Sequence, residues 1–183
     1  MNLKIYIVSE DYMDFLRNVE NRIPRQYYVD SNNSSKRKFK PFIGIVFTTP
    51  EGIKYCTQIS SPKDRHKNLS ETIDFKKYYL TDSSGNQKLT GVINLNYMFP
   101  VNDLVITKLT YQNLSVVRDF DSEKEKSKYW KFLIRQLNAI NAFDWTSDIE
   151  DVYYYRNSVV AKRSLNFKFL EQKCKEWEDS HKS

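Results

Sequence analysis

KPFIGIVFTTPEGIKYCTQIS, residues 40–60, is the stretch that decides the fold of this chain. Its two arms, 42–49 and 53–59, are rich in β-branched and aromatic residues, which favour strands. Between the arms lies Pro50-Glu51-Gly52, a turn in which glycine supplies the positive backbone angle that a tight hairpin needs. The stretch predicts an antiparallel hairpin, and SPKDRH at 61–66 is expected to form a loop directly after it.

Strand patterns also occur on both sides of this hairpin. Apolar and polar residues alternate over 3–8, which is typical of a half-buried strand. Residues 75–80 and 88–95 repeat the hairpin arrangement, and 105–108 resembles one further strand. The polar segment 25–40 is interpreted as a loop.

The remaining segments show helical periodicity, and Pro24 ends the first of them. Apolar residues at helical spacing follow Ser9, Ser122, Ser147 and Asn166. No internal repeat is visible, and the strands precede most of the helices. The sequence therefore predicts one α+β domain over 1–183, with a largely antiparallel sheet in about 1–110 and helices in about 122–178.

Composition narrows the class of protein. The chain carries a net charge of +6, which is compatible with a polyanionic partner. Aromatic residues make up 15% of it; most are expected in the core, and a few exposed tyrosines could stack on bases. Cys56 and Cys174 are far apart in the sequence, and we expect both to be reduced thiols. The N-terminal apolar run is too short for a signal peptide, and none approaches a membrane span. These features predict a cytoplasmic protein with no membrane partner.

Several kinds of catalytic site are disfavoured by the sequence. His66 and His181 are far apart and the acidic residues do not cluster, so we expect no metal site and no cofactor. The four glycines each have a strand or turn explanation, which leaves no glycine-rich phosphate loop. Neither a nucleophile elbow nor a cysteine–histidine pair is indicated.

The residues that remain suit RNA cleavage. RNA supplies its own nucleophile, the 2′-hydroxyl, so an enzyme need provide only a base, an acid and cations for the developing charge. Candidates for these roles are Lys40, Ser60, Ser61, Lys63 and His66. On spacing alone the simpler interpretation is a turn with solvated charges. The basic run KRKFK at 36–40 likewise fits either a solvated loop or a strip that grips phosphates.

Four collinear blocks resemble the ToxN/AbiQ family, the endoribonuclease toxins of type III toxin–antitoxin and phage abortive-infection systems. They are SEDY at 9–12, KPFIGIV at 40–46, SSPKDRHKN at 60–68 and GVINLNYMFP at 91–100, and NFKFLE at 166–171 fits as well. The resemblance implies a fold similar to the Kid/MazF toxins. That fold is a strongly bent antiparallel sheet forming a partial barrel, with flanking helices.

The resemblance also implies an activity and partners. Family members cut RNA without metal through the 2′-hydroxyl and leave a 2′,3′-cyclic phosphate. Their substrates are cellular and phage RNAs. An RNA antitoxin of tandem pseudoknot repeats restrains them, and they trim its precursor into repeat units. An oligomeric protein–RNA complex is therefore a possible assembly.

Carried over to this chain, the family's active-site residues are Tyr12, Lys40, Ser60, Ser61, Lys63 and His66. Further RNA contacts are expected from Lys36, Arg37, Lys38, Phe39, Arg65 and Lys67. The pattern of the first helix by itself slightly favours a packing role for Tyr12. Either a lysine with a lowered pKa or His66 could be the base or the acid. The alternative functions are a non-catalytic RNA-binding regulator and, more weakly, a protein whose basic loops bind nothing specific.

Overall fold

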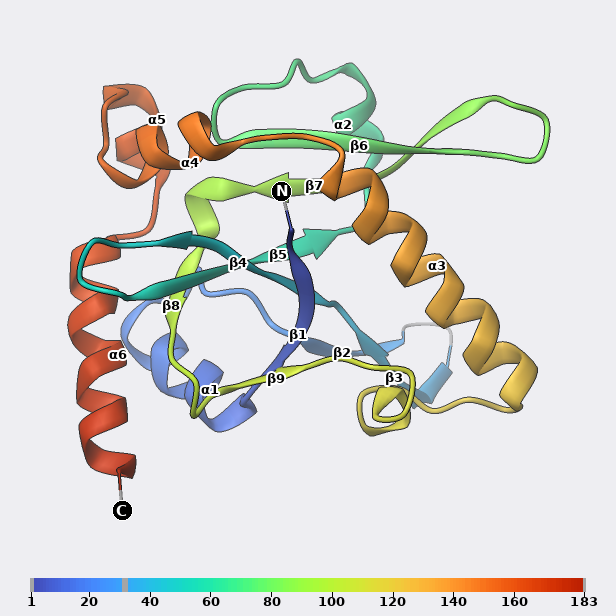
Figure 1. The fold of residues 1–183 in the computed structure, drawn as a ribbon, viewed down its shortest axis with the longest axis horizontal. Helices are drawn as coiled ribbons and strands as arrows, with labels where there is room; N and C mark the ends of the chain where they lie inside the picture. Colours follow the sequence, from blue (N-terminus) through green and yellow to red (C-terminus); the bar gives the residue numbers. More distant parts are fainter. Residues whose placement is uncertain (1, 31–32, 183) are drawn as a thin grey trace.

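The computed structural model describes residues 2–30 and 33–182, without the side chains of 28–38. Within these residues, seven antiparallel strands form one open sheet in the order β6-β7-β5-β4-β1-β9, with β8 beside β5 (Figure 1). The strands are β1 (Lys4–Val8), β4 (Phe42–Thr48), β5 (Lys54–Ser60), β6 (Phe75–Thr81), β7 (Gln87–Asn94), β8 (Phe99–Val101) and β9 (Ile106–Lys108).

The sheet bends because β5 changes partner along its length. Its first half, Lys54–Cys56, pairs with β8, whereas Ile59 and Ser60 pair with β7. A register shift in β4 between Gly44 and Phe47 adds to the bend, as bulges do. The predicted β4–β5 hairpin is confirmed, and Gly52 has the expected positive φ of 86°. The far end of β5, at Ser60, therefore lies where the sheet turns.

Six helices in the described residues flank this sheet: α1 (Glu10–Val19), α2 (Asp64–Asn68), α3 (Glu123–Asn141), α4 (Thr146–Tyr153), α5 (Ser158–Arg163) and α6 (Phe167–His181). Two short 3₁₀ turns, η1 (Leu95–Tyr97) and η2 (Leu114–Val116), join other elements. Helix α3 lies against β6, and α6 against β8 (Figure 1). Across residues 2–30 and 33–182, we find no helix that is both long and apolar enough to cross a membrane.

Capping residues explain where the main helices begin. The side chains of Ser9, Ser122 and Asn166 each accept a hydrogen bond from a main-chain N–H in the first turn of α1, α3 and α6. All three starts agree with the sequence. The α+β class, with an antiparallel sheet and flanking helices, is confirmed.

The prediction of a loop over 25–40 is wrong. This segment contains a second, two-stranded sheet made of β2 (Tyr27–Asp30) and β3 (Asn33–Phe39). Ladder hydrogen bonds form between main-chain groups, so a polar segment can make them without an apolar alternation. Likewise, residues 61–66 are not wholly a loop, because α2 begins at Asp64. The strand β8 and helix α5 were also not predicted; with only three and six residues, they are too short to show a period.

Candidate active site

A pocket of about 590 Å³ opens where β5 ends. This pocket is lined by six of the residues that we expect to form the active site or to contact RNA: Lys40, Ser60, Ser61, Lys63, Arg65 and His66. They come from three places, namely the segment before β4, the end of β5 and the start of α2. The structure therefore brings together residues that are up to 26 positions apart, since 66 − 40 = 26.

Lys40 is held in place by a buried glutamine. The main-chain N–H of Lys40 donates to the carbonyl oxygen of Gln26 at 2.8 Å. The Gln26 side chain in turn bonds both main-chain groups of Val8, so it ties this segment to β1. Burial lowers the pKa of Lys40, and the positive charge of Lys63 lowers it further. A lysine in this setting is neutral more often than a solvated one.

The hydroxyl pair lies at a change of direction. Ser60 is the last residue of β5 and pairs with Val92 of β7, which fixes its position. Ser61 is exposed at the edge of the pocket. Pro62 cannot donate to a ladder, so the chain leaves the sheet here. It then enters α2, for which Lys63 is the N-cap residue.

His66 is buried, at 7% exposed, although it lines the pocket. Its Nδ1 accepts a hydrogen bond from the main-chain N–H of Lys63 at 3.1 Å, and its ring packs edge-on against Phe75. Burial lowers the pKa of His66, and the charges of Arg65 and Lys63 lower it further. His66 is therefore neutral at physiological pH.

The neutral ring of His66 has one acceptor nitrogen. The Nε of Arg65 lies 3.4 Å from Nε2 of His66, but the shorter bond from the main chain already occupies Nδ1. The neutral ring can accept only one of these two hydrogen bonds at a time. In either tautomer the acceptor nitrogen of His66 already has a donor, either the main-chain N–H of Lys63 or the Arg65 Nε–H.

Asp74 and Arg163 form an ion pair in the same pocket, and the sequence did not single out either residue. The Asp74 side chain is buried and the Arg163 side chain is exposed. Arg163 Nε donates to Asp74 Oδ2 at 2.7 Å, and Thr72 Oγ1 donates to Asp74 Oδ1 at 2.7 Å. Burial acts to raise the pKa of Asp74, but the hydrogen bonds from Arg163 and Thr72 outweigh it and lower the pKa. The Asp74 side chain is only 3% exposed, so it is not open to a ligand. Its hydrogen bond from Arg163 instead fixes the position of the Arg163 guanidinium.

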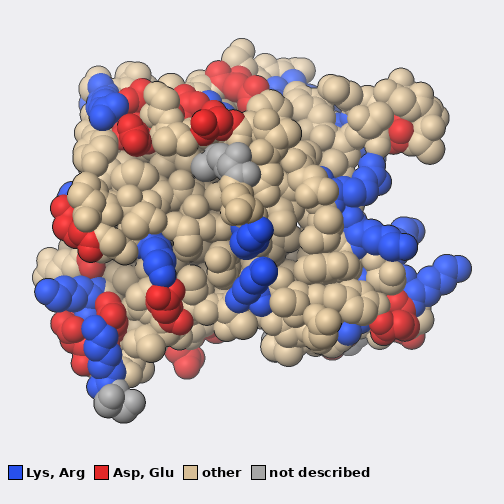
Figure 2. All heavy atoms as spheres, in the orientation of Figure 1, with Lys and Arg blue, Asp and Glu red and all other residues tan. Residues whose placement is uncertain are grey.

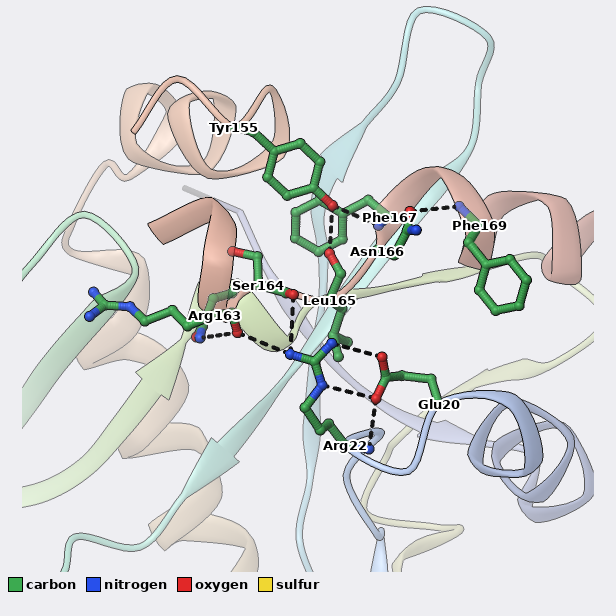
Figure 3. A network of polar contacts seen from close by, with 10 residues as sticks. Glu20, Arg22, Tyr155, Arg163, Ser164, Leu165, Asn166, Phe167 and Phe169 are labelled. Carbon is green, nitrogen blue, oxygen red and sulfur yellow. Dashed lines mark hydrogen bonds and ion pairs between the residues drawn. The ribbon is translucent and has the colours of Figure 1, made fainter. Parts of the chain in front are cut away.

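Figure 3 shows how the main chain beside Arg163 is fixed. Arg22, in the segment after α1, binds the Glu20 carboxylate and also donates to the carbonyl oxygens of Arg163 and Ser164. The Arg163 side chain points away from this network (Figure 3). Asp74 holds the other end of that side chain. Both ends of Arg163 are thus anchored.

The pocket is electropositive. Among the described residues that line it, one is acidic, Asp74, and four are cationic: Lys40, Lys63, Arg65 and Arg163. Helix α3 carries five more basic residues, and Figure 2 shows Lys and Arg side chains along this helix, at the right of the molecule. An anionic, extended ligand fits this distribution of charge.

Two of the expected site residues lie elsewhere. The resemblance placed Tyr12 in the RNA groove, but the structure places it in the core at 0% exposed. Its hydroxyl donates to the carbonyl oxygen of Pro100 at 2.7 Å, and its ring packs against Trp177 of α6. Tyr12 therefore fixes α1 against the sheet and α6. Lys67 is 68% exposed, outside the pocket, and paired with Asp64.

Within the basic run at 36–40, Lys40 lines the pocket but Phe39 does not. Phe39 is 5% exposed and packs against Tyr27, so it is not the open stacking ring expected from the sequence. It forms part of the wall of a second pocket next to the first. The side chains of Lys36, Arg37 and Lys38 lie outside the described residues.

Comparison with known proteins identifies the family. A sequence profile described as "Toxin ToxN, type III toxin-antitoxin system" matches residues 4–175. The chain belongs to the ToxN toxin family. It is 26% identical over 179 residues to Endoribonuclease ToxN of Pectobacterium atrosepticum, covering 96% of this chain and 94% of that protein. Endoribonuclease ToxN of Bacillus thuringiensis subsp. kurstaki is 21% identical, with 97% and 86% covered.

Solved structures share the fold. AbiQ, a lactococcal anti-phage endoribonuclease of a type III toxin–antitoxin system, superposes with a TM-score of 0.71 at 19% identity, covering 98% of this chain and 99% of AbiQ. A structure from a bacterial antiviral system that a processed non-coding RNA regulates has a TM-score of 0.67 at 26% identity, covering 94% and 98%. The ToxN fold thus extends over almost the whole chain.

Proposed function

We propose that this chain is the endoribonuclease toxin of a type III toxin–antitoxin system and that it cuts RNA in the pocket around Lys40 and Ser61. One observation carries the proposal: in a chain of the ToxN family, Lys40 before β4 and the pair Ser61 and Lys63 between β5 and α2 converge on one cationic pocket. The curated ToxN relatives are endoribonucleases by name. We propose that residues 1–183 form a single endoribonuclease domain.

The chemistry follows from these side chains. The 2′-oxygen of the substrate attacks the adjacent phosphorus, the bond from phosphorus to the 5′-oxygen breaks, and a 2′,3′-cyclic phosphate and a 5′-hydroxyl result. Ser61 and Lys63 bind the phosphate oxygens and stabilise the charge that develops on them. The 2′-hydroxyl proton passes to a base, and the 5′-oxygen takes a proton, which the Lys63 ammonium supplies.

Lys40 fits the role of the base better than His66. Burial and Lys63 lower the pKa of Lys40, so its neutral amine is more populated. The acceptor nitrogen of His66 is already bound to the N–H of Lys63. Arg65, which also lines the pocket, instead supplies a cation that suits a phosphate oxygen. Such a site needs neither a metal ion nor a cofactor.

The partner that restrains this activity is a structured RNA. Relatives of this fold include a toxin that a non-coding RNA pseudoknot selectively inhibits and an antiviral system that a processed non-coding RNA regulates. We propose that an RNA antitoxin of pseudoknot repeats covers the pocket of this chain and that the same pocket trims its precursor. Cellular and phage RNAs are the free toxin's substrates, and the cytoplasm is where it meets them.

Cleavage by the purified protein in the presence of EDTA tests the proposal. Single-stranded RNA should be cut, with 2′,3′-cyclic phosphate ends. Ser61→Ala and Lys63→Ala should each slow cleavage by roughly 10²–10⁴-fold. Ser84→Ala, in the exposed β6–β7 turn, is the matched control and should cut like the wild type. Strict dependence on a divalent ion, 3′-hydroxyl products or wild-type rates in both variants would contradict the mechanism, and binding without cleavage would indicate a regulator.

A further inference from the structure

A second pocket adjoins the first across Lys40 and Ser61. It has a volume of about 260 Å³, and both residues line it as they line the first pocket. The two pockets therefore meet at the proposed base, Lys40, and at Ser61, one of the groups that would bind the scissile phosphate. Because an endonuclease cuts inside a strand, one nucleotide lies on each side of that phosphate. A site on each side of Lys40 and Ser61 matches this geometry.

The walls of the second pocket have the chemistry of a base-binding site. Helix α3 contributes Phe132, a ring that is 41% exposed, and Tyr129. The guanidinium of Arg118 lies 4.4 Å from the centre of the Tyr129 ring, so a cation and a ring are already stacked there. Proteins bind unstacked bases on aromatic rings and on the planes of arginine side chains.

One polar group in this pocket is held in a single orientation. Gln136 of α3 is 5% exposed, and its Oε1 accepts a hydrogen bond from the Tyr78 hydroxyl at 2.6 Å. Tyr78 itself crosses β7 at Gly91, where a Cβ atom would collide with its ring. With its oxygen engaged, Gln136 retains the Nε2 donors, which suit an acceptor on the edge of a base.

We propose that the second pocket, defined by Lys40, Ser61, Arg118, Tyr129, Phe132 and Gln136, binds the base of the nucleotide on the far side of the scissile phosphate. This inference rests on the proposed function and deepens it by naming a second nucleotide subsite. It also brings α3 into contact with the RNA, because Gln136 offers its Nε2 donors to an acceptor on the edge of that base.

A binding experiment tests the subsite without cleavage. A short RNA around a mapped cleavage site carries 2′-deoxyribose at the scissile nucleotide, which removes the nucleophile, and 2-aminopurine at either flanking position. At one of these two positions the wild type should quench the fluorescence. Phe132→Ala should abolish that quenching and weaken affinity by roughly 5- to 100-fold, the usual contribution of one stacked base. Phe143→Ala, at a position that is 47% exposed and outside both pockets, is the control and should leave the quenching and the affinity unchanged.

A cleavage experiment provides the second measurement. An RNA with an abasic residue at the quenched position should be cut by the wild type as slowly as Phe132→Ala cuts the normal RNA, and the two losses should not multiply. Wild-type cleavage and binding by Phe132→Ala, or quenching at neither flanking position, would overturn the subsite. A wild type that binds and quenches but never cuts would contradict the proposed function and leave the subsite standing.

Discussion

The ammonium group of Lys63 lowers the pKa of Lys40, which burial has already lowered. Two lysines facing one pocket repel each other when both are charged, so one of them gives up its proton more easily. The main chain enforces this proximity, because Lys40 is bonded to Gln26 and Lys63 is fixed as the N-cap residue of α2. A phosphate between them would meet a cation on one side and a base on the other.

The first prediction concerns the pH at which Lys40 titrates. Its pKa should lie below the ordinary value of 10.5, and Lys63→Gln should raise it by removing the neighbouring charge. If neutral Lys40 is the base, kcat/KM rises with pH up to the pKa of Lys40, so the variant's profile shifts to higher pH. NMR of ¹³C-methylated lysines measures the pKa, and Lys40→Arg assigns the signal.

Lys67→Gln is the matched control for this titration. It removes the same charge from α2, but Lys67 is 68% exposed and points outside the pocket. It should leave the pKa of Lys40 unchanged. A Lys40 pKa of 10.5 or above, or an equal effect of the two variants, would show that the pocket does not couple Lys40 to Lys63.

The second prediction separates a packing role for Tyr12 from a catalytic one. Tyr12→Phe removes the donor from the buried Pro100 carbonyl and should lower the free energy of unfolding by about 1–2 kcal/mol. Cleavage well below the melting temperature should stay within a few-fold of wild type. Tyr79→Phe, at a 40% exposed position, should change neither quantity. Loss of cleavage in Tyr12→Phe with unchanged stability would return Tyr12 to the site.

Part of the fold follows directly from local chemistry. The β4–β5 hairpin was predictable because its arms have strand composition and Gly52 supplies the turn. Ser9, Ser122 and Asn166 marked the starts of α1, α3 and α6 for the same local reason. The β2–β3 sheet was not predictable, because the sequence of β3, NSSKRKF, shows no alternation of apolar and polar residues. For Tyr12 the apolar period of α1 predicted a packing position, and the structure buries its side chain in the core.

The candidate site was predictable only where it is local in sequence. Ser61, Lys63 and His66 lie within one short motif, and their shared pocket follows from it. Asp74 and Arg163 are 89 positions apart, and no local pattern pairs a carboxylate with a guanidinium at that distance. Asn94 and Asn96, which also line the pocket, fall in the block 91–100 that carried the family resemblance. The block 91–100 was therefore the one sequence signal that included residues from this wall of the pocket.

The third prediction concerns stability in acid. The pKa of His66 is below 6.5 in the folded chain, so between these two values the unfolded chain binds more protons. The free energy of unfolding should therefore fall as the pH drops through 6.5 and level off below the folded pKa, with a slope of at most about 1.4 kcal/mol per pH unit. His66→Asn lacks this contribution, and urea unfolding of both proteins from pH 7.5 to 5 isolates it. Equal pH dependence would mean that His66 is solvated.

The last prediction concerns the basic run before β4. If Lys36, Arg37 and Lys38 bind RNA phosphates, replacing all three with glutamine should weaken binding and flatten its salt dependence. Each lost contact reduces the slope of log K against log salt by roughly 0.7, so the triple variant should lose about 2.

The matched control removes three charges from α6 and its C-cap residue, at Lys173, Lys175 and Lys182, on the opposite side of the molecule from β3 (Figure 1). Its salt slope should stay near that of the wild type. An equal change in both triple variants would mean that net charge, +6 in the native chain, governs RNA binding rather than the run itself.

Lys40→Ala should have a different effect from the triple variant at 36–38. It should abolish cleavage and toxicity, because Lys40 lines both pockets. The triple variant should retain part of its toxicity and escape RNA neutralisation more easily. The opposite ranking would place the RNA groove on the other side of β4.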